Sequence, residues 1–145
     1  MTNEEMKKLI LTIEKLTEEV RQLNEFLKQE NEKQRRKKKN ISNDIKQLLF
    51  TMGIMPNLKG FDYLCMAIEI RMKDPKALLT KEIYPQIAKK FGVVPSNIDR
   101  GIRTAIKNAI QRMDEETKLK IWKNSSIKEL TNNEFISLVA EFLQN

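Results

Sequence analysis

The chain has 145 residues, of which 40% are hydrophobic and 32% charged, enough for one packed domain with an appendage. It has no histidine and one cysteine, Cys65, which excludes an internal disulfide framework, an imidazole base and the common zinc sites. The formal net charge of +7 favours a polyanionic partner, nucleic acid before a membrane. No run of residues resembles a membrane span or a signal peptide, so we expect a cytoplasmic protein with no membrane partner.

Residues 1–32 contain a heptad repeat that no glycine or proline interrupts. The two apolar heptad positions are occupied by Met6, Leu9, Ile13, Leu16, Val20, Leu23 and Leu27. Branched residues at the first position with leucine at the second favour a parallel coiled coil of two helices. This segment therefore predicts a coiled-coil dimerisation helix, pairing with itself or with a partner chain. The alternative is an amphipathic helix that lies on its own domain.

Residues 33–40, KQRRKKKN, follow as a basic linker with six positive charges and no negative one. Mutual repulsion of these charges predicts that no stable helix forms here. The segment is either a solvated hinge or a tail that lies along DNA phosphates, and the two interpretations are compatible. The candidate phosphate contacts are Arg35, Arg36, Lys37, Lys38 and Lys39.

Residues 41–145 show helical spacing of apolar residues and no convincing strand-like alternation, which predicts an all-α domain. The first helix is expected to end at Gly53, and the second to run over residues 57–74. The core side of the second helix is expected to consist of Tyr63, Leu64, Ala67, Ile68 and Met72.

A helix-turn-helix is predicted in the middle of this domain. Pro85 suits a first helical residue, Gly92 suits a left-handed cap, and a long helix is expected over about residues 95–112. The inner sides of the two helices are formed by Ile87, Ala88, Phe91, Val93, Ile98, Ile102, Ala105 and Ala109. Gly101 permits the close approach that a tight helix-turn-helix requires.

The outer face of the second helix of this pair carries long polar side chains. They are Ser96, Asn97, Arg100, Arg103, Thr104 and Lys107. Arginine can bond guanine through two parallel hydrogen bonds, and asparagine can do the same for adenine. Asp99 is a candidate to accept from a cytosine amine or to orient Arg100 or Arg103. Val94 is a poor N-cap, and a phosphate can satisfy the free N–H groups at this helix start. The alternative is an ordinary solvated helix face.

The end of the domain predicts two further helices. Residues 115–122 have a weak helical pattern. The last helix has a strong start, because Thr131 and Glu134 form a Thr-x-x-Glu capping box and Leu130 and Phe135 are placed as a hydrophobic staple.

Residues 41–145 resemble the C-terminal DNA-binding domain of the master sporulation-initiation response regulators of endospore-forming bacteria. The resemblance rests on KGFDYLCMAI, LTKEIYPQIAKKFG, SNIDRGIRTAI and LTNNEFISLVAEFL, in family order and spacing. It implies a six-helix fold with a central helix-turn-helix that binds double-stranded DNA at a TGTCGAA-type box. Arg100 and Arg103 match arginines of the family's recognition helix, whereas Asp99 replaces a glutamate and Asn97 an arginine.

The rest of the family pattern is altered in this chain. The family carries an N-terminal receiver domain, for which residues 1–39 are too short, so we expect the coiled coil to replace phosphorylation in driving dimerisation. The family's segment after the recognition helix approaches the sigma subunit of RNA polymerase. Its counterpart here, MDEETKLKIWKN at residues 113–124, differs strongly in sequence.

No catalytic or cofactor-binding pattern stands out elsewhere. Cys65 lies on an apolar helix and is expected to be a buried structural thiol. Asp114, Glu115 and Glu116 are interpreted as a charge cluster at a helix N-terminus instead of a metal site. No phosphate-binding or dinucleotide fingerprint occurs. We therefore expect neither an enzyme nor a bound cofactor or metal.

The sequence thus predicts a sequence-specific, DNA-binding transcription regulator that dimerises through its N-terminal helix. The alternative is a protein-interaction module or antagonist, in which the coiled coil docks another regulator. A pure adaptor has no need for Arg100 and Arg103 on an outward helix face, and DNA binding therefore discriminates between the two.

Overall fold

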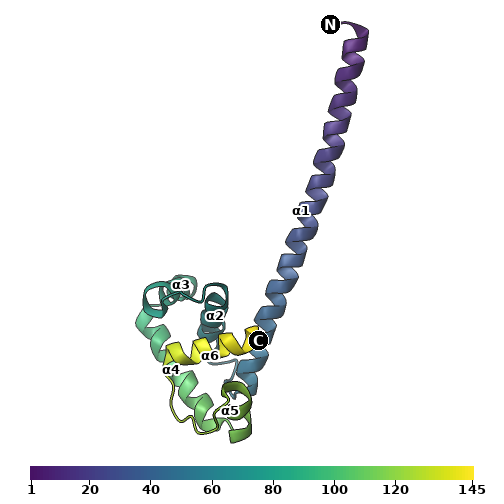
Figure 1. The fold of residues 1–145 in the computed structure, drawn as a ribbon. Helices are drawn as coiled ribbons and strands as arrows, with labels where there is room; N and C mark the ends of the chain where they lie inside the picture. Colours follow the sequence, from purple (N-terminus) through teal and green to yellow (C-terminus); the bar gives the residue numbers. More distant parts are fainter. The chain divides into compact units, whose positions relative to one another are not determined.

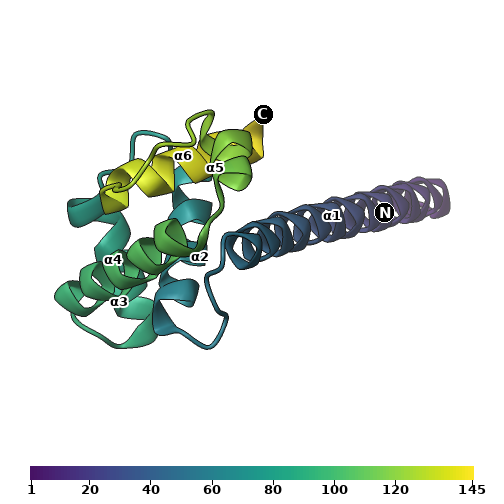
Figure 2. The same ribbon diagram turned by 90° about the horizontal axis from the view of Figure 1, so that it is seen from below.

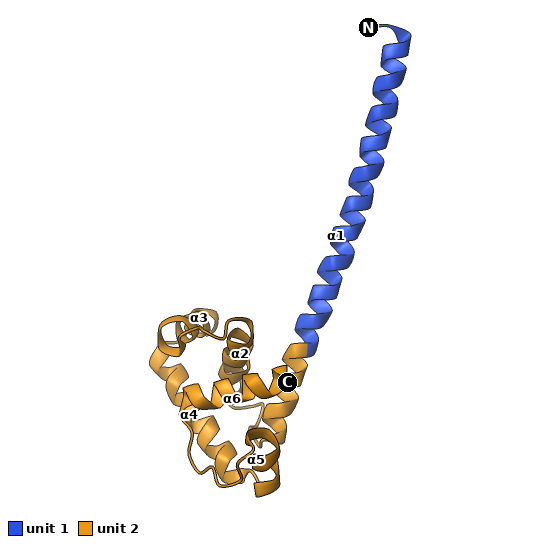
Figure 3. Ribbon diagram, viewed as in Figure 1, with its two compact units in different colours: residues 1–40 blue, residues 41–145 orange.

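The structure, a computed structural model, describes all residues from 1 to 145 as helices and connecting segments, without a strand. The predicted all-α fold is confirmed. The chain divides into two compact units, residues 1–40 and residues 41–145, which Figure 3 shows in different colours. None of the helices combines the length and the apolarity that a membrane crossing requires.

Helix α1 (Asn3–Thr51) supplies residues 3–40 of the first unit. Arg21 pairs with Glu18 and Glu25, each one turn away on the same helix face, an arrangement that supports an isolated helix. The heptad residues are each between 48% and 57% exposed. They are Met6, Leu9, Ile13, Leu16, Val20, Leu23 and Leu27. Within the first unit, the heptad seam is therefore an exposed apolar stripe.

The expectation that residues 33–40 form no stable helix is wrong. Helix α1 continues through all of them without a break. Lysine, arginine and glutamine are among the better helix formers. Each like-charged pair one turn apart costs only a few tenths of a kcal/mol, and exposed charges are further screened by salt. Because the helix is already nucleated, each added residue gains a backbone hydrogen bond that outweighs this repulsion.

The second unit is a domain of six helices joined by short segments (Figure 1). A five-residue π-helical turn, η1 (Leu79–Ile83), leads directly into the third helix. The helices are the last turns of α1 (residues 41–51), α2 (Lys59–Lys73), α3 (Tyr84–Phe91), α4 (Pro95–Arg112), α5 (Glu115–Trp122) and α6 (Asn132–Gln144).

Helix α2 packs against α3, α4 and α6, and α4 lies between α3 and α6 (Figure 2). Large aliphatic side chains from several helices are fully buried between them, together with one aromatic ring. They include Ile45, Leu49, Leu64, Ile68, Ile83, Ile87, Ile98, Ile102, Phe135 and Ile136. Burial of each such side chain contributes roughly 1.5–3 kcal/mol. This core fixes α4 by its apolar side and leaves the opposite side free.

The core face of α2 differs from the prediction at its C-terminal end. Tyr63, Leu64, Ala67 and Ile68 are buried as expected. Met72, however, is only half-buried, and its neighbour Arg71 is 8% exposed. The Arg71 guanidinium donates to Ser137 Oγ at 2.6 Å and to Asn133 Oδ1 at 2.8 Å, both on α6. Arg71 therefore fastens α2 to α6, which hydrophobic periodicity does not reveal.

The left-handed cap predicted at Gly92 and the capping box predicted at the start of α6 are confirmed. Gly92 ends α3 in the left-handed region with φ 65°, where a glycine carries no Cβ penalty. Thr131 and Glu134 form both hydrogen bonds of the capping box at the start of α6. Asp114 caps α5 by accepting from the Thr117 N–H at 2.7 Å.

Candidate nucleic-acid interface

Helices α3 and α4 form a tightly connected pair. Only residues 92–94 separate them, and the Val93 N–H donates to the Ala88 carbonyl at 3.1 Å. Phe91 is exposed on the surface of the pair, yet its ring packs edge-on against Tyr63 of α2, with 5.2 Å between centroids. The pair thus has the form of a helix-turn-helix whose second helix packs against α2.

The outward side of α4 is a continuous polar strip. It consists of Ser96, Asn97, Arg100, Arg103, Thr104 and Lys107, all of them exposed. At about 100° of rotation per residue, these six side chains fall within an arc of about 120°. The buried residues Ile98, Ile102, Ala105 and Ala109 lie outside this arc. We call these six exposed residues the polar strip of α4.

Arg100 and Arg103 differ in their surroundings. Arg103 forms an ion pair with Asp99, one turn before it on the same helix. Arg100 projects near the middle of the polar strip, and no carboxylate lies within ion-pair distance of it. Its guanidinium therefore keeps all five donors available for an incoming acceptor.

Asp99 does not belong with the exposed residues of α4. Its side chain is only 34% exposed, and its carboxylate accepts from Arg103, Tyr84 and Asn132. Of the two roles predicted for it, the contacts match the orienting of Arg103.

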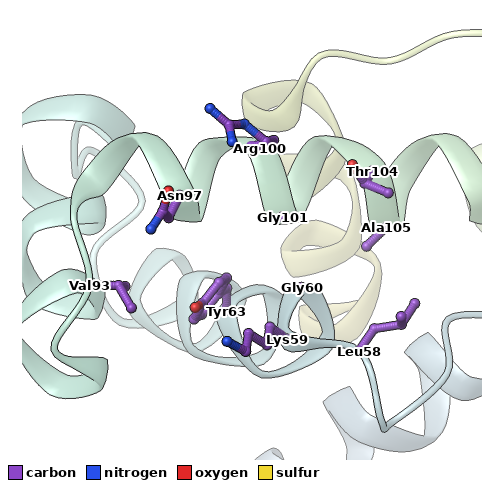
Figure 4. A pocket seen from close by; sticks show the side chains of 10 residues that line it. All are labelled: Leu58, Lys59, Gly60, Tyr63, Val93, Asn97, Arg100, Gly101, Thr104 and Ala105. Carbon is purple, nitrogen blue, oxygen red and sulfur yellow. The ribbon is translucent and has the colours of Figure 1, made fainter.

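A groove borders the polar strip on the side of α2. Its volume is about 340 Å³, and its walls come from the start of α2, the α3–α4 turn and α4 (Figure 4). Asn97, Arg100 and Thr104 line it from α4, and Lys59 lines it from α2. The sequence did not single out Lys59, because it lies 38 residues before Asn97 and only the α2–α4 crossing brings them together.

The start of α4 has no side-chain cap. Val94 at the N-cap position accepts no backbone N–H through its side chain, as its chemistry requires. Pro95 follows and has no N–H to satisfy. The helix N-terminus and the neighbouring Lys59 and Arg100 together give this end of the polar strip a positive character.

The other predicted contacts lie in the first unit. Arg35, Arg36, Lys37, Lys38 and Lys39 are exposed on the helical basic segment. Their charges point in all directions around the helix, since successive residues differ by about 100°. This segment can meet a polyanion from any side.

Cys65 and Asp114 both occupy positions that serve the fold: Cys65 lies partly in the core, and Asp114 caps α5. Cys65 is half-buried, and burial raises the pKa of its thiol to about 12, so the reactive thiolate is scarce at neutral pH. Hydrogen bonding to Thr117 lowers the pKa of Asp114, which acts as the cap of α5. Glu115 and Glu116 lie in the first turn of that helix, as predicted.

Fold and site together define an all-helical domain of the helix-turn-helix type with a basic, outward-facing second helix. Residues 45–143 match the family model described as the C-terminal region of the sporulation initiation factor Spo0A. This match covers more than half of the chain, and the protein belongs to that family. The predicted resemblance is confirmed. As a member of a DNA-binding family, the protein is a transcription regulator whose partner is DNA.

Proposed function

We propose that the protein is a sequence-specific regulator that dimerises through α1 and reads a TGTCGAA-like box in double-stranded DNA with α4. The observation that carries the proposal is the polar strip of α4, an uninterrupted row of exposed donors opposite a fully buried apolar side. A recognition helix of a helix-turn-helix presents such a row to base edges in the major groove. In this role the protein acts in the cytoplasm, on the nucleoid.

Within this proposal each residue of the polar strip has a distinct task. Arg100, with free donors, bonds a guanine through its O6 and N7 atoms. Asn97 bonds an adenine, because its amide has both a donor and an acceptor in reach of N6 and N7. Lys107 lies about three turns after the helix start and contacts a phosphate, where it adds affinity without base preference. Lys59 contacts a phosphate from the other wall of the groove.

Self-pairing of α1 is supported by its flanking heptad positions. The flanking positions e and g border the seam on either side. In a parallel coiled coil, each g residue of one helix faces the e residue that lies five positions later on the partner helix. No such pair is like-charged, because the pairs are Glu5 with Ile10, Thr12 with Thr17, Glu19 with Asn24, and Phe26 with Asn31. Identical strands therefore meet without charge repulsion beside the seam.

The seam also ends where the basic segment begins. After Leu27, the next seam positions are taken by Glu30, Gln34 and Lys37. Polar and charged residues at these positions oppose close pairing of the two helices. The two basic segments of a dimer are thus free to separate, and each can lie along DNA phosphates.

RNA polymerase is a further partner in this proposal, through the surface around α5. Leu119 on α5 is 56% exposed, between Lys118 and Lys120. An exposed leucine flanked by lysines suits a mixed apolar and acidic protein surface. The segment occupies the place in the chain that the family uses for polymerase contact.

Selection of bound sites from random double-stranded DNA tests the proposed function. The full chain should enrich one box, and enriched molecules should carry two boxes at a fixed spacing, because a dimer binds two half-sites. Arg100→Lys is the matched control, since it keeps the charge but loses the planar fork, and it should weaken the enrichment at one base. If the full chain enriches no sequence, the interaction-module interpretation replaces ours.

A further inference from the structure

A cluster of polar side chains ties the recognition helix to both of its neighbours. Tyr84 begins α3, Asp99 and Arg103 lie on α4, and Asn132 begins α6. The Tyr84 hydroxyl donates to Asp99 Oδ1 at 3.0 Å. Asn132 Nδ2 lies 3.1 Å from Asp99 Oδ1, 3.1 Å from the Asp99 carbonyl and 3.0 Å from the Tyr84 hydroxyl. Arg103 Nη2 donates to the remaining carboxylate oxygen, Oδ2.

The inner half of this cluster is buried and the outer half is exposed. Tyr84 is 3% exposed and Asn132 is 9% exposed, whereas the Arg103 side chain is 67% exposed. Burial raises the pKa of Tyr84 to about 12, which keeps its phenol protonated as a donor. Asp99 therefore connects two buried donors to one exposed guanidinium.

We propose that Asp99 is a positioning residue, and that Tyr84 and Asn132 anchor it so that Arg103 is presented to one base of the DNA site. This inference rests on the proposed function and adds a residue-level cause of its specificity. Oδ1 of Asp99 accepts from both buried donors and Oδ2 accepts from Arg103, so the proposal assigns the carboxylate to Arg103 instead of to a cytosine amine. The buried residues Tyr84 and Asn132 then influence base preference without any contact to DNA.

The physical reason lies in the flexibility of arginine. An exposed arginine has many rotamers, and holding one of them for base contact costs conformational entropy. An anchored carboxylate one turn away fixes the guanidinium before DNA arrives, and thus lowers that cost. It also limits Arg103 to one direction. An unanchored Arg103 can instead turn to a phosphate, which carries no sequence information.

Tyr84→Phe is the sharpest test, because it removes one hydroxyl from a buried ring that cannot reach DNA. Binding of the full-length protein is measured for the preferred box and for every single-base variant of it. Arg103→Ala, measured on the same set, identifies the base that Arg103 reads. We expect Tyr84→Phe to reduce discrimination at that base by about fivefold, the effect of one net hydrogen bond, with unchanged affinity for unrelated DNA.

Two further variants separate positioning from general loss of stability. Ser137→Ala removes a partner of Arg71 on α6, outside this cluster, and should leave all base preferences unchanged. Asp99→Asn removes the ion pair and one negative charge. It should raise affinity for unrelated DNA and reduce discrimination at the base assigned to Arg103.

Two results would overturn the inference. In the first, Tyr84→Phe keeps the wild-type preference at every base. In the second, Asp99→Asn changes the preference at a base that Arg103→Ala leaves intact, as expected of a carboxylate that reads cytosine directly. A wild type without any preferred box would overturn the proposed function together with this inference. The two failures are thus distinguished by the wild-type data alone.

Discussion

Gly60 of α2 and Gly101 of α4 face each other where the two helices cross. A Cβ atom on Gly60 would lie 2.4 Å from the Gly101 carbonyl oxygen and 3.0 Å from the Ala105 Cβ. No side chain fits at this distance, and the backbone of α4 cannot give way without disturbing Ile98 and Ile102 in the core. The crossing fixes how far the recognition helix stands from α2.

Gly60→Ala should therefore destabilise the domain by about 1–3 kcal/mol, the usual cost of overpacking a closely packed site. The gain in helix propensity, about 1 kcal/mol, offsets only part of the clash. Chemical denaturation followed by circular dichroism measures the change. Gly101→Ala is the matched control, because its Cβ would meet the Tyr63 ring at 3.2 Å and the Gly60 Cα only at an ordinary contact distance of 3.7 Å, and it should cost less. Equal stability of Gly60→Ala and wild type would refute the crossing argument.

The second prediction concerns association through the heptad seam. Leu16→Lys places a charge in the seam and should shift the protein from dimer to monomer. Gln22→Lys adds the same charge outside the seam and should leave the dimer intact. Sedimentation equilibrium distinguishes a species of 17.1 kDa from one of twice that mass.

Deletion of residues 1–32 should have the same effect as Leu16→Lys and leave a helical monomer. It should also weaken binding to paired boxes far more than to a single box, because the second contact loses its effective concentration. Identical association states with and without the segment would show that α1 does not dimerise the chain.

The third prediction concerns the basic segment. Replacement of Arg35, Arg36, Lys37, Lys38 and Lys39 with glutamine preserves helix propensity and removes the charges. Affinity for all DNA sequences should fall alike, and the log–log salt slope should flatten by roughly 0.9 for each phosphate that is no longer neutralised. Lys7→Gln together with Lys8→Gln, on the same helix but away from the basic segment, should leave the slope unchanged. A slope that the five substitutions do not alter would make the segment a spacer only.

Local signals were the part of this fold that the sequence could predict. Gly92 and the Thr131–Glu134 pair determine their helix ends through backbone chemistry within four residues, and the structure agrees with both. The basic segment is helical, against the prediction, because helix propensity outweighs the repulsion between its exposed charges.

Contacts between distant residues could not be predicted in the same way. Tyr84, Asp99 and Asn132 are 15 to 48 residues apart, and neither Tyr84 nor Asn132 stands out on its own helix. Asp99 has the spacing of a surface acid, yet its carboxylate is held by buried donors. The exposed face of α4 was predictable from periodicity. The difference between Arg103, which pairs with Asp99, and Arg100, which has no ion-pair partner, is visible only in the structure.

Base readout by α4 is the central claim, and equilibrium binding to a panel of singly substituted boxes tests it most directly. The panel compares wild type with Arg100→Ala, Arg103→Ala, Lys107→Ala and Asn97→Arg. The polar strip is exposed and its residues do not support the core, so all four variants should fold. Any reduction in binding then reports on the DNA interface.

Arg100→Ala should cost about 1–3 kcal/mol at the preferred box and relax the preference at one base. Arg103→Ala should do the same at a second base, and Asn97→Arg should shift one position toward guanine. Lys107→Ala should weaken every sequence about equally. If all four variants weaken binding uniformly, or none weakens it, α4 does not read bases and the proposed function is contradicted.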